Sequence, residues 1–161
     1  MTSLGESRNR IHSTSPDVPA APLLLDTHVW IWMLEENQHR LSEKTLQHLR
    51  ERGKAGELLV SDISFWEVAN KSRKEKLFSM DAMIWMERAG DAPGVTYLPL
   101  ARTTLIQSTR LPGKPPADPA DRILIATAQL NGSSLVTADK QILAYARRER
   151  GISIYDASQL P

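Results

Sequence analysis

The chain has 161 residues, of which 41% are hydrophobic and 24% are charged, and this balance is typical of one globular domain. The formal net charge is +1, which excludes attraction to nucleic acid by bulk charge, so a local arrangement of residues would have to hold such a partner. Cysteine is absent, which excludes disulfides, thiolate metal sites and a cysteine nucleophile and is typical of the reducing cytoplasm.

Residues 1–22 are rich in Ser, Pro, Ala, Asn and Arg and contain few bulky apolar side chains, so we expect a disordered tail. No apolar stretch precedes Leu23, as a secretory signal would require. No apolar run approaches the ~20 residues of a membrane helix. We therefore expect no membrane segment, one folded domain over residues 23–156 and a C-terminal tail over residues 157–161.

From Leu23 onward, short apolar runs alternate with amphipathic stretches, which is typical of βα units and a parallel sheet. The first half of the chain predicts, in order, a strand over 23–25, a short helix through 29–34, a helix from the N-cap Ser42 to Gly53, a strand over 58–60, and helices over 63–74 and 81–88.

The second half of the chain begins with a strand over 95–98, a short helix over 101–109 and a proline-rich loop over 111–119. Asp118 is the expected N-cap of the next helix, with Pro119 at its first position, and Asn131-Gly132 ends that helix. A strand over 134–137, a helix over 140–150 and a last strand over 152–155 complete the expected elements.

Four acidic residues from distant segments are predicted to meet at one edge of this sheet. Parallel strands end at a common edge, the helices that follow begin near it, and ligands of open α/β sheets bind there. Asp26 ends the first strand, and Glu67 lies about one turn into the helix after the second. Asp121 opens the helix that leads to the fourth strand, and Asp139 follows that strand.

Clustered carboxylates repel one another and raise one another's pKa, and a bound divalent cation reverses this local field. A site of oxygen ligands suits Mg²⁺ or Mn²⁺, and the four histidines form no zinc motif. Mg²⁺ held by carboxylates is a common device for hydrolysing phosphodiester bonds with metal-activated water. The acids therefore predict a metal-dependent hydrolase.

Four motifs carry a resemblance to a known family. They are Leu24-Leu25-Asp26-Thr27-His28-Val29-Trp30, the run from Ser61 to Ala69 (SDISFWEVA), the run from Asp118 to Ala126 (DPADRILIA), and Leu135-Val136-Thr137-Ala138-Asp139. In order and spacing, over roughly residues 23–155, they resemble the PIN-domain ribonucleases and in particular the VapC-type toxins.

The resemblance implies a PIN-like three-layer α/β/α sandwich around a mainly parallel sheet of four to five strands. It also implies Mg²⁺- or Mn²⁺-dependent cleavage of RNA, a homodimer, and an antitoxin that inhibits the enzyme at its acidic cleft. By position, Asp26, Glu67, Asp121 and Asp139 match the acids that hold metal. Thr137 matches a hydroxyl residue near the last acid, whereas the basic residue that commonly precedes the extra acid at position 118 is replaced by alanine, with a lysine nearby at 114.

Each of these residues also has a purely structural interpretation. Asp26 could end a strand or cap a helix, and Glu67 could pair with Lys71 one turn later. Asp118 and Asp139 could be helix N-caps, and Asp121 could be a negative charge that the helix dipole favours near the N-terminus.

Residues beside the acids could add contacts. His28 could touch phosphate or support a metal ligand, and Ser64 could hydrogen-bond a ligand or Glu67, although structural roles would explain both. The tryptophans are more typical of a core or an interface than of base stacking. A set of basic residues could follow an RNA backbone or form a solvated face: Lys71, Arg73, Lys74, Lys76, Arg122 and Lys140.

Two alternatives of other classes stay open from the sequence. A magnesium-binding receiver-like signalling module would need two successive acids after the first strand and a lysine after the last, whereas this chain has Asp26-Thr27 and no matching lysine. A PIN-like RNA-binding protein without activity would be expected to lack some of the acids, and they are complete here. The identity of the RNA, the antitoxin and the number of metal ions are not determined by these patterns.

Overall fold

The structure, a computed structural model, describes residues 20–74, 78 and 80–160. Residues 1–19 of the expected tail, and Lys76 of the basic set, lie outside the described residues. Residues 20–22 are described, and the carbonyl oxygen of Pro22 accepts a hydrogen bond of 2.8 Å from the amide of Ser134. The chain is therefore already attached to the sheet just before the first strand.

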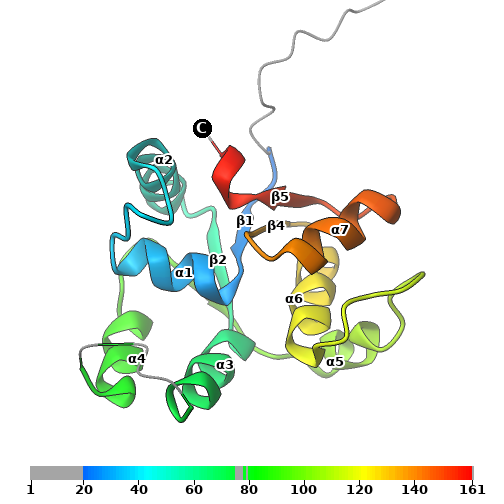
Figure 1. Cartoon of the computed structure of the whole chain (residues 1–161), viewed down its shortest axis with the longest axis horizontal. Coiled ribbons are helices and arrows are strands. Elements are labelled where there is room, and N and C mark those ends of the chain that lie inside the picture. Colours follow the sequence, from blue (N-terminus) through cyan, green and yellow to red (C-terminus); the bar gives the residue numbers. More distant parts are fainter. Residues whose placement is uncertain (1–19, 75–77, 79, 161) are drawn as a thin grey trace, which may run out of the picture.

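The centre of the fold is one parallel sheet of five strands in the order β3-β2-β1-β4-β5 (Figure 1). The strands are β1 (Leu23–Leu25), β2 (Leu58–Ser61), β3 (Thr96–Leu98), β4 (Ser134–Thr137) and β5 (Ile154–Asp156). The middle strand β1 is paired on both sides, which explains why it is a continuous run of buried leucines. Leu25 is in register with Val60 and Val136, so the residues that follow β1, β2 and β4 emerge at the same edge.

Helices cover both faces of the sheet, as the three-layer architecture requires (Figure 1). They are α1 (Thr27–Leu34), α2 (Glu43–Lys54), α3 (Ile63–Ser72), α4 (Ala82–Gly90), α5 (Arg102–Ser108), α6 (Pro119–Leu130), α7 (Lys140–Arg148) and the 3₁₀ helix η1 (Ala157–Gln159). The predicted three-layer α/β/α sandwich around a parallel sheet is confirmed.

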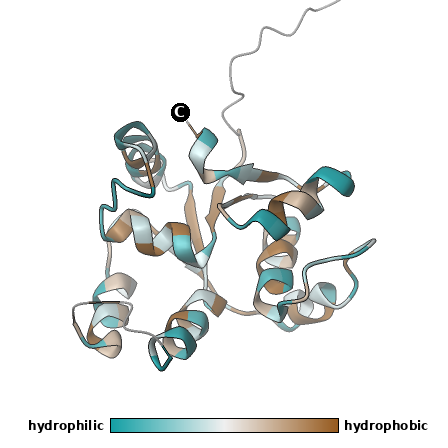
Figure 2. Ribbon diagram, in the orientation of Figure 1, coloured by the Kyte–Doolittle hydropathy of each residue, from teal (hydrophilic) through white to brown (hydrophobic). Residues whose placement is uncertain are grey.

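Alternate residues of β1 point into two separate cores, because successive side chains of a strand face opposite sides of the sheet. Leu23 and Leu25 pack in the core that also contains Trp30, Trp85 and the buried leucines of α2. Leu24 packs in the other core, against α6 and α7. Figure 2 shows the hydrophobic strands between helices whose outer faces are more polar.

The structure differs from the predicted elements mainly at their ends. The last strand lies at Ile154–Asp156 rather than 152–155, after Gly151 turns the chain with a φ of 87°. Helix α3 ends at Ser72 and α7 at Arg148, two residues short of their predicted ends. Within the segment expected as a C-terminal tail, Ala157 and Leu160 are buried in the core that contains Trp30.

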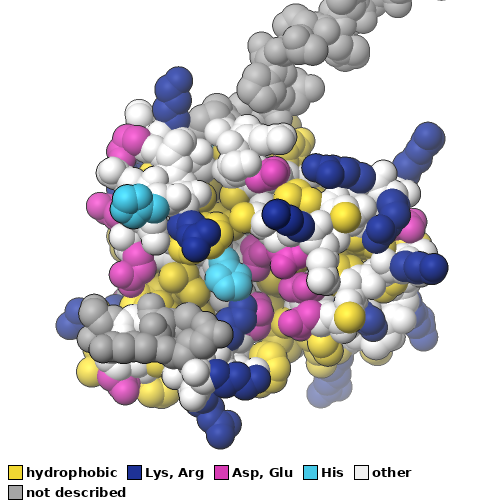
Figure 3. Space-filling model, in the orientation of Figure 1, with side chains coloured by type: hydrophobic (Ala, Val, Ile, Leu, Met, Phe, Trp, Pro, Cys, Tyr) yellow, Lys and Arg dark blue, Asp and Glu magenta, His cyan; other side chains and the backbone are white. Residues whose placement is uncertain are grey.

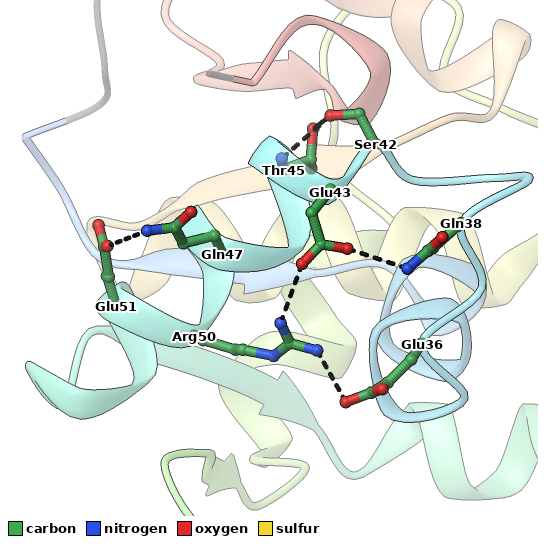
Figure 4. Close-up of polar contacts among 8 residues, drawn as sticks. All are labelled: Glu36, Gln38, Ser42, Glu43, Thr45, Gln47, Arg50 and Glu51. Atoms are coloured by element: carbon green, nitrogen blue, oxygen red, sulfur yellow. Dashed lines mark hydrogen bonds and ion pairs between the residues drawn. The ribbon is translucent and has the colours of Figure 1, made fainter.

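A polar network fastens the loop of residues 35–42, here called the α1–α2 loop, to helix α2 (Figure 4). Arg50 lies 2.7 Å from a carboxylate oxygen of Glu36 and 3.6 Å from one of Glu43, and Gln38 donates a hydrogen bond of 3.0 Å to Glu43. Ser42 caps α2 as predicted, by accepting a hydrogen bond of 3.0 Å from the amide of Thr45. The loop therefore has a defined path beside α1.

Within the described ranges, none of the helices has both the length and the apolar character needed to cross a bilayer.

Candidate acidic site at the carboxyl edge of the sheet

Asp26 lies where the central strand β1 ends and α1 begins. Its backbone is extended, its amide donates to the carbonyl oxygen of Val136 at 2.9 Å, and its side chain makes no capping bond to α1. The side chain is only 5% exposed. The carboxylate of Asp26 is therefore held by the sheet and is free of the capping role that the sequence left open.

Thr137, at the end of the neighbouring strand β4, positions Asp26. Its hydroxyl donates a hydrogen bond of 2.5 Å to Oδ2 of Asp26 and accepts one of 3.0 Å from the amide of Asp139. Thr137 is fully buried, so these bonds are shielded from water. The sequence pointed to Thr137 near the last acid, and the structure shows that it joins the first acid to the backbone of the last.

Glu67, on the first half of α3, is only 6% exposed and faces the end of β1. Its Oε2 accepts a hydrogen bond from the hydroxyl of Thr27, which is also 2.9 Å from the hydroxyl of Ser64. Its Oε1 lies 3.5 Å from Nζ of Lys71. The pair with Lys71 that the sequence offered as a structural alternative therefore exists, within an otherwise buried site.

Thr27 is the functional candidate that sequence reasoning missed. Its partner Glu67 is 40 positions away in the chain, so no local spacing reveals the contact. The available signal was its place after Asp26, because the residue that follows a strand-ending acid in a parallel sheet also lies at the ligand edge. Ser64, a secondary candidate from the sequence, belongs to the same buried hydrogen-bonded group, although it contacts Thr27 rather than Glu67.

Asp121, in the first turn of α6, lies within electrostatic range of the other acids. Burial, and after it the neighbouring charges of Asp118, Asp26, Asp139 and Glu67, together raise its pKa to about 7. All the acids named from the sequence therefore act on this one carboxyl group.

For the two most buried acids, Asp26 and Glu67, hydrogen bonds and positive charges partly offset the effect of burial on the pKa. Burial raises the pKa of Asp26, whereas the hydrogen bond from Thr137 and the charges of His28 and Lys71 lower it. Burial also raises the pKa of Glu67, and the hydrogen bond from Thr27 and the nearby Lys71 oppose this effect. Burial is thus the main influence against the charged forms of both acids, and a cation bound beside them would offset it.

Asp118 and Asp139 are both N-caps, as the structural interpretation of the sequence stated. Oδ1 of Asp118 accepts from the amide of Ala120 at 2.8 Å. Oδ1 of Asp139 accepts from the amides of Gln141 at 2.7 Å and Ile142 at 3.1 Å. Both side chains are exposed, and their capping bonds use one carboxylate oxygen each. Capping does not exclude a second role in the site, which stays a prediction.

Basic side chains surround the acids on this face. Figure 3 shows acidic side chains gathered near its centre, beside a histidine and between groups of lysine and arginine. His28 is exposed, and its Nε2 lies 3.4 Å from Nζ of Lys71. Arg122, in contrast, is turned toward the preceding loop, where its Nε donates to the carbonyl oxygen of Pro116.

The residues of this site fit a divalent cation by their chemistry. The donors are carboxylate and hydroxyl oxygens, which hard ions such as Mg²⁺ and Mn²⁺ prefer, and a cation would relieve the repulsion that Asp121 experiences. In the described part of the chain, however, no three acidic or histidine side chains are close enough to hold a metal as they stand. Binding therefore requires the carboxylates to move toward one another.

Comparisons with known proteins give consistent results. The family described as "PIN domain" matches residues 23–157. The curated protein "Ribonuclease VapC22" of Mycobacterium tuberculosis is 31% identical over 134 residues, which cover 83% of this chain and 98% of the relative.

Similar folds occur among solved structures. A DNA-bound VapBC from Salmonella typhimurium has a TM-score of 0.63 and 19% identity, covering 85% of this chain and 98% of its own. VapBC2 from Rickettsia felis, bound to a promoter DNA fragment, has a TM-score of 0.60 and 14% identity, covering 83% and 97%. A toxin–antitoxin complex from Klebsiella pneumoniae has a TM-score of 0.55 and 16% identity, covering 86% and 99%. At these identities the likeness concerns the fold.

Proposed function

The chain belongs to the PIN-domain family, and on that premise we propose that it is a toxin-type, divalent-metal-dependent endoribonuclease. The observation that carries the proposal is the proximity of acids from distant segments to Asp121. Burial and the charges of four acidic neighbours together raise the pKa of Asp121 to about 7. The relative named as a ribonuclease supports RNA as the substrate.

Asp26, Glu67, Asp121 and Asp139 are the residues that would hold Mg²⁺ or Mn²⁺. When bound, such an ion supplies activation of water and neutralisation of the charge that develops on phosphate. Thr137 holds the carboxylate of Asp26 toward the site, and Thr27 does the same for Glu67.

No protein nucleophile is required. The chain has no cysteine, and the hydroxyls of Thr27 and Thr137 are already hydrogen-bonded to carboxylates. The receiver-like alternative has no support from the family match. It also lacks support from the residues. A single acid, Asp26, stands where a receiver needs two successive acids, and β5 ends at Asp156 and is followed by Ala157 and Ser158 rather than by a lysine.

We propose two protein partners, an antitoxin and a second copy of this chain. The solved structures with this fold include toxin–antitoxin complexes, which supports the first. Large apolar side chains are exposed on α3, α4 and α5, including Trp66 at 58%, Met83 at 70% and Ile106 at 53%, and such a surface is typical of one that a protein partner covers. We further propose that the protein acts on RNA in the cytoplasm.

Incubation of the purified protein with total RNA tests the activity. We expect cleavage with Mn²⁺ or Mg²⁺ and none in EDTA. Asp26→Asn and Asp121→Asn should abolish cleavage and leave a folded protein. Cleavage that either variant retains in EDTA would show that the acids have another role, and an intact wild-type protein that never cleaves RNA would favour an inactive PIN-like protein.

Light scattering after size-exclusion chromatography tests the homodimer. We expect twice the mass of the chain for the wild type, whereas a monomer at micromolar concentration would contradict this part of the proposal.

A further inference from the structure

Basic and aromatic side chains form a continuous strip that leads away from the acids along the exposed side of α1. We define this cation–aromatic strip as Lys71, His28, Trp32 and Arg40. Nε2 of His28 lies 3.4 Å from Nζ of Lys71, and the imidazole lies 5.9 Å from the indole of Trp32, centre to centre. Cζ of Arg40 lies 5.5 Å from the centre of that indole, on its face.

The strip begins inside the acidic site. Nζ of Lys71 is 3.5 Å from Oε1 of Glu67, and Lys71 and His28 are both close enough to Asp26 to act on its charge. From there the strip passes to Trp32, one turn further along α1 than His28, and then to Arg40 in the α1–α2 loop. It therefore connects the position of the proposed chemistry with a cation outside the site.

Arg40 is held in place without being neutralised. The α1–α2 loop is fastened to α2 through Arg50 (Figure 4). Leu41, the residue after Arg40, is buried in the core. Trp32 is only partly exposed and packs against the same core, so it is a firm support for the guanidinium. Over residues 20–74, 78 and 80–160, Arg40 forms no ion pair. Two nearby acids, Glu36 in the same loop and Glu43 in α2, form ion pairs with Arg50 instead.

A polyanion that approaches clustered carboxylates needs cations beside them. Stacking on an indole occupies the face of a guanidinium and leaves its N–H edge free for phosphate oxygens. Contacts to phosphate position a nucleic acid irrespective of its sequence. Cations interleaved with aromatic side chains are the usual composition of surfaces that follow a single strand.

We propose that the cation–aromatic strip binds the backbone of single-stranded RNA next to the bond that is cut, with Lys71 and His28 on the phosphate nearest the acids and Arg40 on one further along. This inference rests on the proposed ribonuclease function and adds the path of the substrate. It assigns a role to Trp32 and Arg40, which the family resemblance did not include.

Binding of a fluorescein-labelled, 12-nucleotide, mixed-sequence RNA, followed by fluorescence anisotropy in EDTA, tests the proposal without cleavage. Arg40→Gln should raise the Kd about five-fold, the effect of one solvent-exposed charge pair. It should also reduce the slope of log Kd against log salt by about 0.7, as expected for one lost phosphate contact on a single strand. Trp32→Leu should weaken binding similarly, and adding Arg40→Gln to it should weaken binding little further.

Arg150→Gln is the matched control. It removes the same charge from an exposed arginine in the turn before β5, at the opposite edge of the sheet, and should leave both the Kd and the salt slope unchanged. If Arg40→Gln binds with the Kd and slope of the wild type, the proposed path is wrong. Cleavage of total RNA by the wild type with Mn²⁺ is measured in parallel. If the wild type cleaves RNA and Arg40→Gln binds RNA as the wild type does, only the proposed role of the cation–aromatic strip is refuted. If the wild type does not cleave RNA, the proposed function itself is refuted.

Discussion

Asp121→Asn should make the metal-free protein more stable while removing its function. In the folded protein, burial and the neighbouring acids raise the pKa of Asp121 to about 7, from 3.8. A group whose pKa is raised by folding favours the folded state only while it is protonated. Its contribution is therefore fully present below about pH 3.8 and is lost as the pH rises to about 7. Asparagine cannot ionise, so the variant escapes this loss.

The size of the effect follows from the shift. Three pKa units correspond to at most about 4 kcal/mol. Asp121 is only partly buried, so solvent screening reduces the expected gain to about 1–2 kcal/mol. For a domain of this size, that gain raises the melting temperature by about 2–8 °C.

Thermal unfolding in EDTA measures this directly. At pH 8 Asp121→Asn should melt above the wild type, and near pH 4 the difference should nearly vanish. Mn²⁺ should raise the melting temperature of the wild type but not of the variant. Asp91→Asn, at an exposed acid at the end of α4, is the control and should show neither effect. The reasoning would be refuted by a variant that melts below the wild type at pH 8 or that keeps the full Mn²⁺ response.

Substitutions at three further residues test the supports of the site. Thr137→Val removes the hydrogen bond to Asp26 and should cost about 1.5–3 kcal/mol in urea unfolding at pH 7 and lower Mn²⁺-dependent cleavage; unchanged stability and cleavage would show that the bond is dispensable. Thr27→Val should weaken Mn²⁺ binding in calorimetry and Thr27→Ser should restore it, whereas equal affinities for all three proteins would exclude a positioning role. Asp118→Ala should cost about 1 kcal/mol through the lost cap and Asp118→Asn much less; if Asn also abolishes cleavage, Asp118 acts in the site as well as in the cap.

The fold was predictable because local signals and global packing agree. The buried leucines of β1 end at an acid, and Asp118-Pro119 and Asn131-Gly132 mark the two ends of α6 where the structure has them. The parallel order then brings the ends of β1, β2 and β4 to one edge, so topology alone places Asp26, Glu67 and Asp139 on that side of the sheet.

The supporting contacts were not predictable, because they join residues far apart in the chain. Thr27 bonds to Glu67 across 40 positions, and Thr137 to Asp26 across 111. Which rotamers meet depends on how α3 and β4 pack, and the sequence pattern does not contain that information. Trp66 is a similar case, since its periodicity suits a core or an interface equally and only the packed structure shows that it is exposed.

The central claim is that the acids at the carboxyl edge of the sheet hold a divalent ion. A crystal grown with Mn²⁺, with diffraction recorded at the manganese absorption edge, tests it most directly. We expect an anomalous peak bounded by the carboxylates of Asp26 and Asp121, with Glu67 or Asp139 completing the ligands. A protein that cleaves RNA with Mn²⁺ but shows its anomalous peak away from these side chains would contradict the account.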